Sequence, residues 1–189
     1  MSEMGHSGEA APGAERWHLG RSEEEAELAG FEFSLERLLH AYYRWKSECL
    51  AAVTDGQFSG TDAAVLNVVR MKDRAKGLTE VCRILNREDT PNIQYAIRKL
   101  LKSGLIEKAA AASRKGTSYR ATDHGRAVTD AYADLRATVL LSLTRAIGDR
   151  ADGFAAAEQV LTRMSGLYDQ AAKLASERRY RERALDEPR

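Results

Sequence analysis

The sequence predicts a mainly helical protein that carries one small β-hairpin. Three observations support this fold class. The 189 residues include only three prolines, and they are rich in Ala, Leu, Glu and Arg, which favour helices. Apolar residues recur at steps of three and four along most of the chain. Between residues 105 and 121, two short segments in which apolar and polar residues alternate flank a small loop, as expected for a pair of strands.

The first part of the chain is predicted to hold a tail and three helices. Residues 1–29 are rich in Gly, Ala, Ser and Glu without helical periodicity, so we expect a disordered tail. A long amphipathic helix is predicted over residues 31–53, and Asp55-Gly56 ends it. A second helix follows the capping segment at residues 59–62. A third helix covers residues 78–86.

A fourth helix begins with Asp89 or Thr90 as its cap, because Pro91 suits the first turn of a helix. It ends at Lys102, and Gly104 is expected in the left-handed conformation that closes many helices. Strands at residues 105–109 and 117–121 then form the hairpin. The loop between them is small and basic.

Two long helices are predicted after the hairpin, at residues 122–147 and 152–176, with a break at Gly148-Asp149 and a charged, frayed end. The predicted organisation has five parts. They are a tail (1–29), an N-terminal dimerisation helix (30–57), a central domain (58–126), C-terminal dimerisation helices (127–178) and a charged tail (179–189). The apolar stripes of the flanking helices favour burial against a second copy of the chain, and an intrachain helical bundle is the alternative.

Charge is distributed unevenly, although the net charge is only +1. Residues 59–126 hold 14 Lys and Arg against 7 Asp and Glu, whereas the rest of the chain holds 15 against 21. A basic block between acidic flanks is typical of a nucleic-acid-binding module. Chance clustering on a solvated surface is the alternative.

The composition argues against several other classes of protein. No apolar stretch is long enough to cross a membrane, and no secretory signal begins the chain, so we expect a cytoplasmic protein. No catalytic motif or phosphate-binding loop appears, so we expect neither an enzyme nor a cofactor. The four histidines are too scattered for a metal site; they are His6, His18, His40 and His124.

Two short helices, a tight turn and a hairpin make the layout of a winged helix-turn-helix domain. The fourth helix has an apolar face for docking, and its other face carries groups that can bind DNA. Asn and Gln pair with adenine and Arg with guanine, while Lys suits phosphates. The candidate DNA-binding residues that this pattern indicates on the helix are Asn92, Gln94, Tyr95, Arg98, Lys99 and Lys102. An ordinary surface helix would explain the two lysines equally well, but not the amides near the start.

The region from residue 59 to about residue 128 resembles the MarR family of bacterial winged-helix transcription regulators. The segments that carry this resemblance are "LTEVCRILNREDTPNIQYAIRKLLKSGLIEK", "SRKGTSY" and "ATDHGRA". The resemblance implies a homodimer that binds double-stranded DNA at a pseudo-palindromic operator, most simply as a repressor. It also implies a wing-tip contact in the minor groove from Arg114 or Lys115, and contacts from the fourth helix at Thr90, Asn92, Gln94, Tyr95 and Arg98.

The wing departs from the family pattern, which has an acidic residue followed by paired arginines, because here Ser113-Arg114-Lys115-Gly116 follows four alanines. The sequence leaves open whether a small-molecule effector binds between the dimer helices and the DNA-binding lobe. Cys49 lies in the first long helix, where some relatives sense oxidants, but a buried thiol is the favoured interpretation. A protein-interaction or architectural module that binds nucleic acid without sequence preference is the alternative function.

Overall fold

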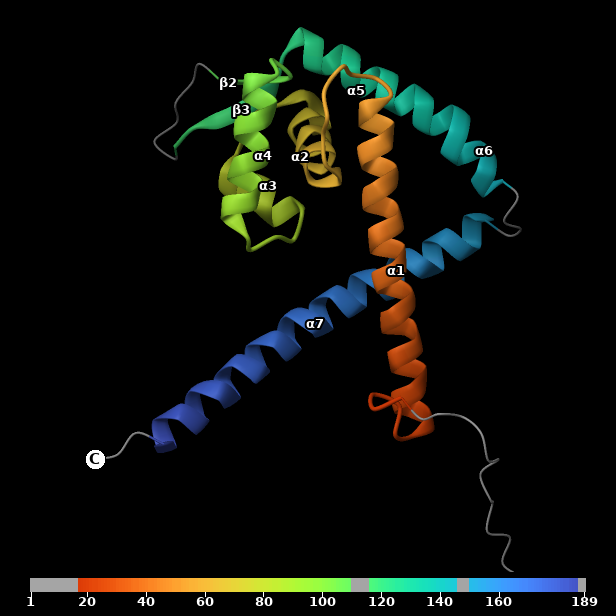
Figure 1. The fold of residues 1–189 in the computed structure, drawn as a ribbon, viewed down its shortest axis with the longest axis vertical. Helices are drawn as coiled ribbons and strands as arrows, with labels where there is room; N and C mark the ends of the chain where they lie inside the picture. The colour runs from red at the N-terminus through yellow and green to blue at the C-terminus, as the bar shows by residue number, and fades with distance from the viewer. Residues whose placement is uncertain (1–16, 110–115, 146–149, 187–189) are drawn as a thin grey trace, which may run out of the picture. The chain divides into compact units, whose positions relative to one another are not determined.

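We describe a computed structural model that covers residues 17–109, 116–145 and 150–186. The chain divides into two compact units, Met1–Asp134 and Leu135–Arg189, and each is described by itself. The elements of the first unit follow in the order α1 (Glu23–Ala51), α2 (Gly60–Arg70), η1 (Met71–Asp73), β1 (Lys76–Gly77), α3 (Leu78–Ile84), α4 (Thr90–Lys102), β2 (Ile106–Lys108), β3 (Ser118–Ala121) and α5 (Asp123–Leu135) (Figure 1).

Helix α1 begins at Glu23, so the predicted tail of residues 1–29 is too long. Ser22 caps the helix: its hydroxyl accepts from the backbone N–H of Glu25 (3.2 Å), whose carboxylate accepts from the N–H of Ser22 (3.3 Å). The acidic run that we assigned to the tail therefore forms the first helical turn, where carboxylates interact favourably with the free N–H groups. Residues 1–16 lie outside the described residues.

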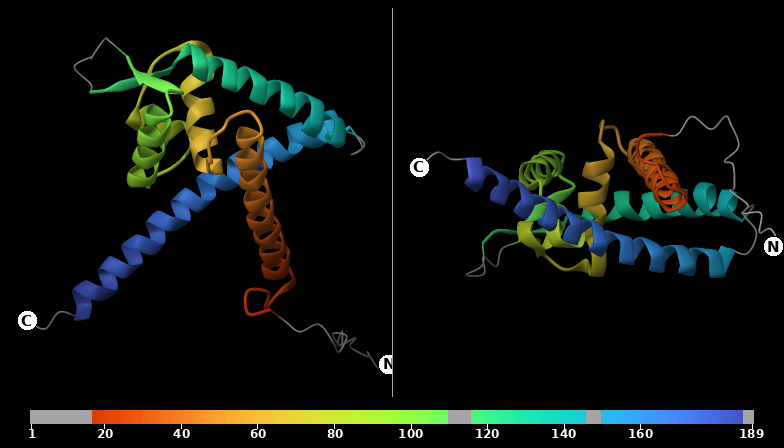
Figure 2. Two further views of the ribbon diagram at one scale, coloured as in Figure 1. Left: turned by 45° about the horizontal axis from the view of Figure 1, so that its top comes forward. Right: turned by 90° about the horizontal axis from the view of Figure 1, so that it is seen from below.

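Helix α2 is the centre of the first unit, because it lies between α1 and α4 and packs against both (Figures 1 and 2). The predicted capping segment is confirmed: the Ser59 hydroxyl accepts from the N–H of Asp62 (3.1 Å), and the Asp62 carboxylate accepts from the N–H of Ser59 (2.8 Å). Its buried apolar side chains are Ala63, Ala64, Val65, Leu66, Val68 and Val69. This helix supplies most of one wall of the core.

The connection from α2 to α3 holds two features that the sequence analysis missed. Lys72 and Asp73 in η1 both adopt left-handed backbone conformations, with φ of 57° and 50°. Lys76 is buried at the start of β1, and burial lowers the pKa of its ammonium group. That group donates to three backbone carbonyls, those of Val69, Met71 and Arg74. Lys76 therefore satisfies carbonyls at the end of α2 and in the turn that follows it.

The sheet has three antiparallel strands in the order β1-β3-β2. The predicted hairpin of β2 and β3 is confirmed, with Ile106 opposite Ala121 and both side chains buried. The third strand, β1, pairs Lys76 with Tyr119 and was not expected. It has two residues, too few for an alternating pattern. Gly104, with φ of 67°, closes α4 as predicted.

The second unit continues with a π-helical turn (η2, Arg136–Leu140), α6 (Leu141–Thr144) and α7 (Arg150–Asp186). We expected one helix over residues 122–147, and helical structure runs without interruption from Asp123 to Thr144, with a π-helical turn at Arg136–Leu140 that the sequence did not indicate. The predicted break at Gly148-Asp149 lies outside the described residues.

Helix α7 continues through the predicted charged tail as far as Asp186. Ion pairs one helical turn apart support this end, since Arg178 lies 2.9 Å from Glu182 and Arg181 lies 3.8 Å from Glu177. None of the helices in the described parts of the chain has an apolar stretch that would cross a membrane.

Candidate nucleic-acid interface

Helix α4 has two chemically different faces. It buries four apolar side chains, those of Ile93, Ala96, Ile97 and Leu100. Its other side carries Tyr95, Arg98 and Lys102 at steps of three and four residues, and all three are exposed. Residues at this spacing lie on the same side of a helix, so they form a continuous outward stripe. Tyr95 is 63% exposed, a large aromatic surface left in solvent.

A tight turn joins α3 to α4 and sets the direction of α4. Asn86 adopts a left-handed φ of 50°, and the N–H of Arg87 donates to the carbonyl of Cys82 (2.9 Å). The helices on either side of this turn pack against each other and against α2. The helix-turn-helix that the sequence predicts is therefore present.

The remaining candidates on α4 lie near its first turn. Asn92 and Gln94 are exposed, and Thr90, the first residue of the helix, is half-buried. The Thr90 hydroxyl lies 3.4 Å from the carbonyl of Glu88. The amide nitrogen of Asn92 donates to the Asp89 carboxylate (2.8 Å), which favours one orientation of this amide.

Asp89 precedes α4 and is the centre of a polar cluster that our sequence analysis did not foresee. The guanidinium group of Arg87 pairs with both carboxylate oxygens of Asp89, with 2.6 Å between Nε and Oδ1. Another nitrogen of Arg87 donates to the hydroxyl of Tyr43 on α1 (3.4 Å). The Arg87 guanidinium and the Asn92 amide hold the pKa of Asp89 well below its usual range. The spacing Arg-x-Asp is a local signal for this pair, whereas nothing local indicates Tyr43.

Lys99 lies apart from the outward stripe of α4. Its ammonium group is 2.9 Å from the Asp62 carboxylate, which belongs to the capping segment of α2. It also lies 5.1 Å from the centre of the Phe58 ring, within cation–π distance. The structure therefore gives Lys99 a contact that docks α4 on α2, and it separates Lys99 from the exposed candidates.

Ion pairing divides the cations of the basic block into two groups. Six described cations pair with carboxylates: Arg70, Arg74, Arg87, Lys99, Arg120 and Arg126. Within the described ranges of this block, the exposed cations without a carboxylate at ion-pair distance are Lys72, Arg83, Arg98, Lys102 and Lys108. Arg98 and Lys102 of this second group lie on the outward stripe of α4, where a positive charge remains available to an anionic partner.

The structure describes the two strands of the wing, β2 and β3. Glu107 on β2 and Arg120 on β3 are directly opposite each other and form an ion pair of 2.7 Å. Lys108 is exposed where β2 ends. The predicted wing-tip residues Arg114 and Lys115 lie outside the described residues.

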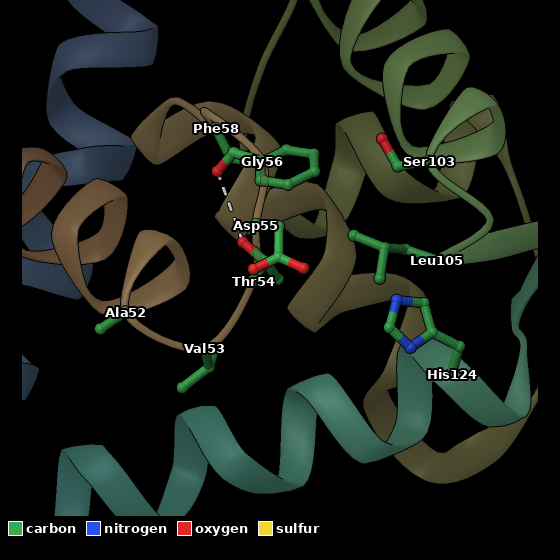
Figure 3. Close-up of a pocket in the computed structure, with 9 residues that line it drawn as sticks. All are labelled: Ala52, Val53, Thr54, Asp55, Gly56, Phe58, Ser103, Leu105 and His124. Atoms are coloured by element: carbon green, nitrogen blue, oxygen red, sulfur yellow. Dashed lines mark hydrogen bonds between the residues drawn. The ribbon is translucent and has the colours of Figure 1, made fainter.

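A surface pocket lies at the C-terminal end of α4 (Figure 3). It is lined by the connection from α1 to α2, by Ser103 and Leu105, and by the exposed side chain of His124 on α5. Cys49 is not part of it. The Cys49 thiol is buried and lies 3.8 Å from the carbonyl of Tyr132, in agreement with its interpretation as a core side chain.

Residues 58–125 match a family model described as a winged helix DNA-binding domain. No curated protein sequence matches the chain. Solved structures are similar in fold. A MarR family transcription regulator has a TM-score of 0.63 at 15% identity, covering 80% of this chain and 96% of that one.

Two similar structures were solved with DNA. The M. tuberculosis transcriptional regulator MOSR has a TM-score of 0.57 at 14% identity, covering 74% of this chain and 96% of its own. The transcriptional repressor CouR, bound to a 23-mer DNA duplex, has a TM-score of 0.58 at 24% identity, covering 75% of this chain and 95% of its own. The winged-helix fold class that the sequence predicts is thereby confirmed.

Proposed function

We propose that this chain, whose residues 58–125 form a winged helix DNA-binding domain, is a transcription regulator that recognises a specific sequence in double-stranded DNA. The observation that carries the proposal is the outward stripe of α4. This stripe presents a phenol, a guanidinium and an ammonium group, while the opposite face of the same helix is fully buried. A helix that enters the major groove needs both properties.

In this proposal α4 is the recognition helix. Arg98 reads a guanine through its two-pronged guanidinium, and Asn92 and Gln94 read adenines. Lys102 and the hydroxyl groups of Thr90 and Tyr95 bind phosphates and fix the position of the helix. Lys99 orients α4 through Asp62, and we assign it no DNA contact.

The wing contacts the neighbouring minor groove through Arg114 and Lys115, because a narrow groove concentrates negative potential that attracts such cations. The fold that this chain shares with MOSR and CouR, both solved with DNA, supports this mode of binding. CouR is described as a repressor, which favours repression here as well.

We further propose that the protein acts as a homodimer on a pseudo-palindromic operator. Helix α1 exposes Leu28, Phe33, Leu38, Leu39 and Tyr42, and α7 exposes Phe154, Val160, Leu161, Leu167 and Leu174. Such apolar surface on long helices favours burial against another chain. A two-fold axis then places two copies of α4 about 34–36 Å apart, one turn of DNA.

Selection of bound duplexes from a library with a randomised central segment tests the proposal. We expect enrichment of one inverted repeat with half-sites one helical turn apart. Arg98→Ala is then expected to cost ~1–3 kcal/mol of binding free energy and to relax specificity at one base pair. Arg178→Ala on α7 removes the same charge and should leave that preference intact. Recovery of duplexes without a shared sequence would contradict the proposal.

A further inference from the structure

We infer that Asp89, anchored by Arg87, holds the side-chain amide of Asn92 in the one orientation that reads an adenine, and so determines base specificity without touching DNA. This inference rests on the proposed function, since it concerns how α4 reads its operator. Asp89 is a positioning residue, and Asn92 makes the contact.

The hydrogen bonds of Asp89 are the first argument. An aspartate before the first turn of a helix usually accepts from backbone N–H groups of that turn. Asp89 has no such bond from its side chain. Its carboxylate accepts instead from two side chains, the guanidinium of Arg87 and the amide of Asn92. The carboxylate that would ordinarily cap α4 therefore binds the exposed amide of Asn92 instead.

The chemistry of the bond fixes the orientation of that amide. An ionised carboxylate only accepts hydrogen bonds, so the side of Asn92 that faces Asp89 must be its NH₂ group. The carbonyl oxygen of Asn92 then points elsewhere and stays available, together with the second N–H. Adenine is read by one acceptor and one donor side by side. An amide held in one orientation presents these groups in a fixed order and loses less entropy on binding.

Arg87 keeps this arrangement rigid. It is half-buried, its backbone N–H is bonded to α3, and its side chain reaches Tyr43 on α1. Tyr43 is itself closely packed, since a Cβ added at Gly60 would lie 2.5 Å from its carbonyl oxygen. The depressed pKa of Asp89 keeps its carboxylate ionised to lower pH than an ordinary aspartate. The orientation of Asn92 is thus tied to the core of the domain.

The test measures base preference with the full chain and a duplex selected from the randomised library. The preference is the ratio of dissociation constants for that duplex and for versions changed at one adenine position. We expect Asn92→Ala to abolish a preference of ~5-fold or more at one position. Asp89→Ala should reduce the same preference to below about 3-fold, at the same position only.

Two variants control for folding and charge. Asp89→Ser keeps a hydroxyl that can cap α4 but is too short to bridge Arg87 and Asn92, so it should lose the preference while the helix remains capped. Glu88→Ala removes one exposed negative charge from the same turn. It should raise affinity for all duplexes alike and leave the preference unchanged.

A double variant separates positioning from general stability. If Asp89 acts through Asn92, then Asp89→Ala adds no further loss of preference in the Asn92→Ala background. An Asp89→Ser protein that keeps the full preference would overturn the inference, and so would an Asn92→Ala protein that keeps it. In either case the proposed function stands as long as the native chain selects a sequence. A native chain that selects none overturns both.

Discussion

The ammonium group of Lys99 on α4 lies 2.9 Å from the carboxylate of Asp62, whose side chain is only 3% exposed. The same carboxylate oxygen accepts the N–H of Ser59 at the start of α2. A single buried carboxylate therefore both caps the central helix and holds the proposed recognition helix against it. Lys102 is also a lysine and lies less than one turn further along α4. Among the described residues it has no carboxylate at ion-pair distance.

This relationship predicts unequal effects on stability for the same substitution at Lys99 and at Lys102. Lys99→Met leaves the buried Asp62 without its cation and is expected to lower the free energy of unfolding by ~1–3 kcal/mol. Lys102→Met should change it by less than about 0.5 kcal/mol, because this side chain is exposed. Urea unfolding of the two variants measures the difference.

The two lysine variants should also differ in the salt dependence of their DNA affinity. We expect Lys102→Met to reduce the slope of log affinity against log salt by about 1, as for a lost phosphate contact, and Lys99→Met to leave the slope unchanged. Equal reductions in both variants would show that Lys99 also reaches a phosphate and that its contact with Asp62 is broken on DNA.

A second prediction concerns the close approach of α5 to the end of α4. A Cβ added at Gly125 would lie 1.9 Å from the backbone carbonyl oxygen of Leu105. Nearby, the Thr122 hydroxyl donates to the carbonyl of Gly104 and accepts from the N–H of Gly125. Backbone held in this way cannot move aside cheaply, so Gly125→Ala is expected to destabilise the first unit by at least ~1–3 kcal/mol.

Gly30 in α1 provides the matched control. A Cβ there meets nothing within 4 Å, so Gly30→Ala should stabilise the protein by ~0.5–1 kcal/mol through helix propensity. Thermal unfolding of both variants checks the signs. A Gly125→Ala protein as stable as the native one would mean that α5 does not pack against the backbone at Leu105.

The central domain was predictable because its signals are local. Ser59 and Asp62 cap α2 three residues apart, and Pro91 and Gly104 mark the ends of α4. The two faces of α4 follow from spacing alone. The strand β1 was missed because it has two residues, and its identity depends on pairing with β3.

The polar contacts of the site were not predictable in the same way. Lys99 and Asp62 are 37 residues apart, so the spacing on α4 could not show that this lysine turns inward. Arg87 and Tyr43 are 44 residues apart. At the N-terminus the error had a different cause: residues 1–29 lack helical periodicity, but the glutamates from Glu23 onward form the first turn of a capped helix.

A third prediction follows from the ionisation of Asp89. Its pKa is lowered in the folded protein from an ordinary value of 3.8. Between the folded and unfolded pKa values the folded state binds fewer protons, so lowering the pH through this range favours unfolding. The stability that Asp89 contributes is therefore present above the ordinary pKa and lost below it.

The measurement is the difference in Tm between the native chain and the Asp89→Ala variant as a function of pH. We expect a constant difference from about pH 8 to pH 5 and a decreasing one as the pH falls below the ordinary pKa. A difference that grows on acidification would have the wrong sign for a carboxylate stabilised by Arg87 and Asn92.

The last prediction concerns α7 and the proposed dimer. Leu161 is exposed on the apolar side of this helix, so Leu161→Glu would bury a carboxylate in an interface between copies and should dissociate the dimer. Gln159→Glu adds the same charge two residues away, on the opposite side of the helix, and should not. Sedimentation at matched concentrations reports the oligomeric state.

The same variant should also separate two kinds of DNA site. Leu161→Glu is expected to weaken affinity for an inverted repeat by ~10-fold or more, because the linkage between two α4 helices is lost. Its affinity for a single half-site should stay unchanged. Equal weakening on both duplexes would instead indicate that the substitution damages the DNA-binding domain itself.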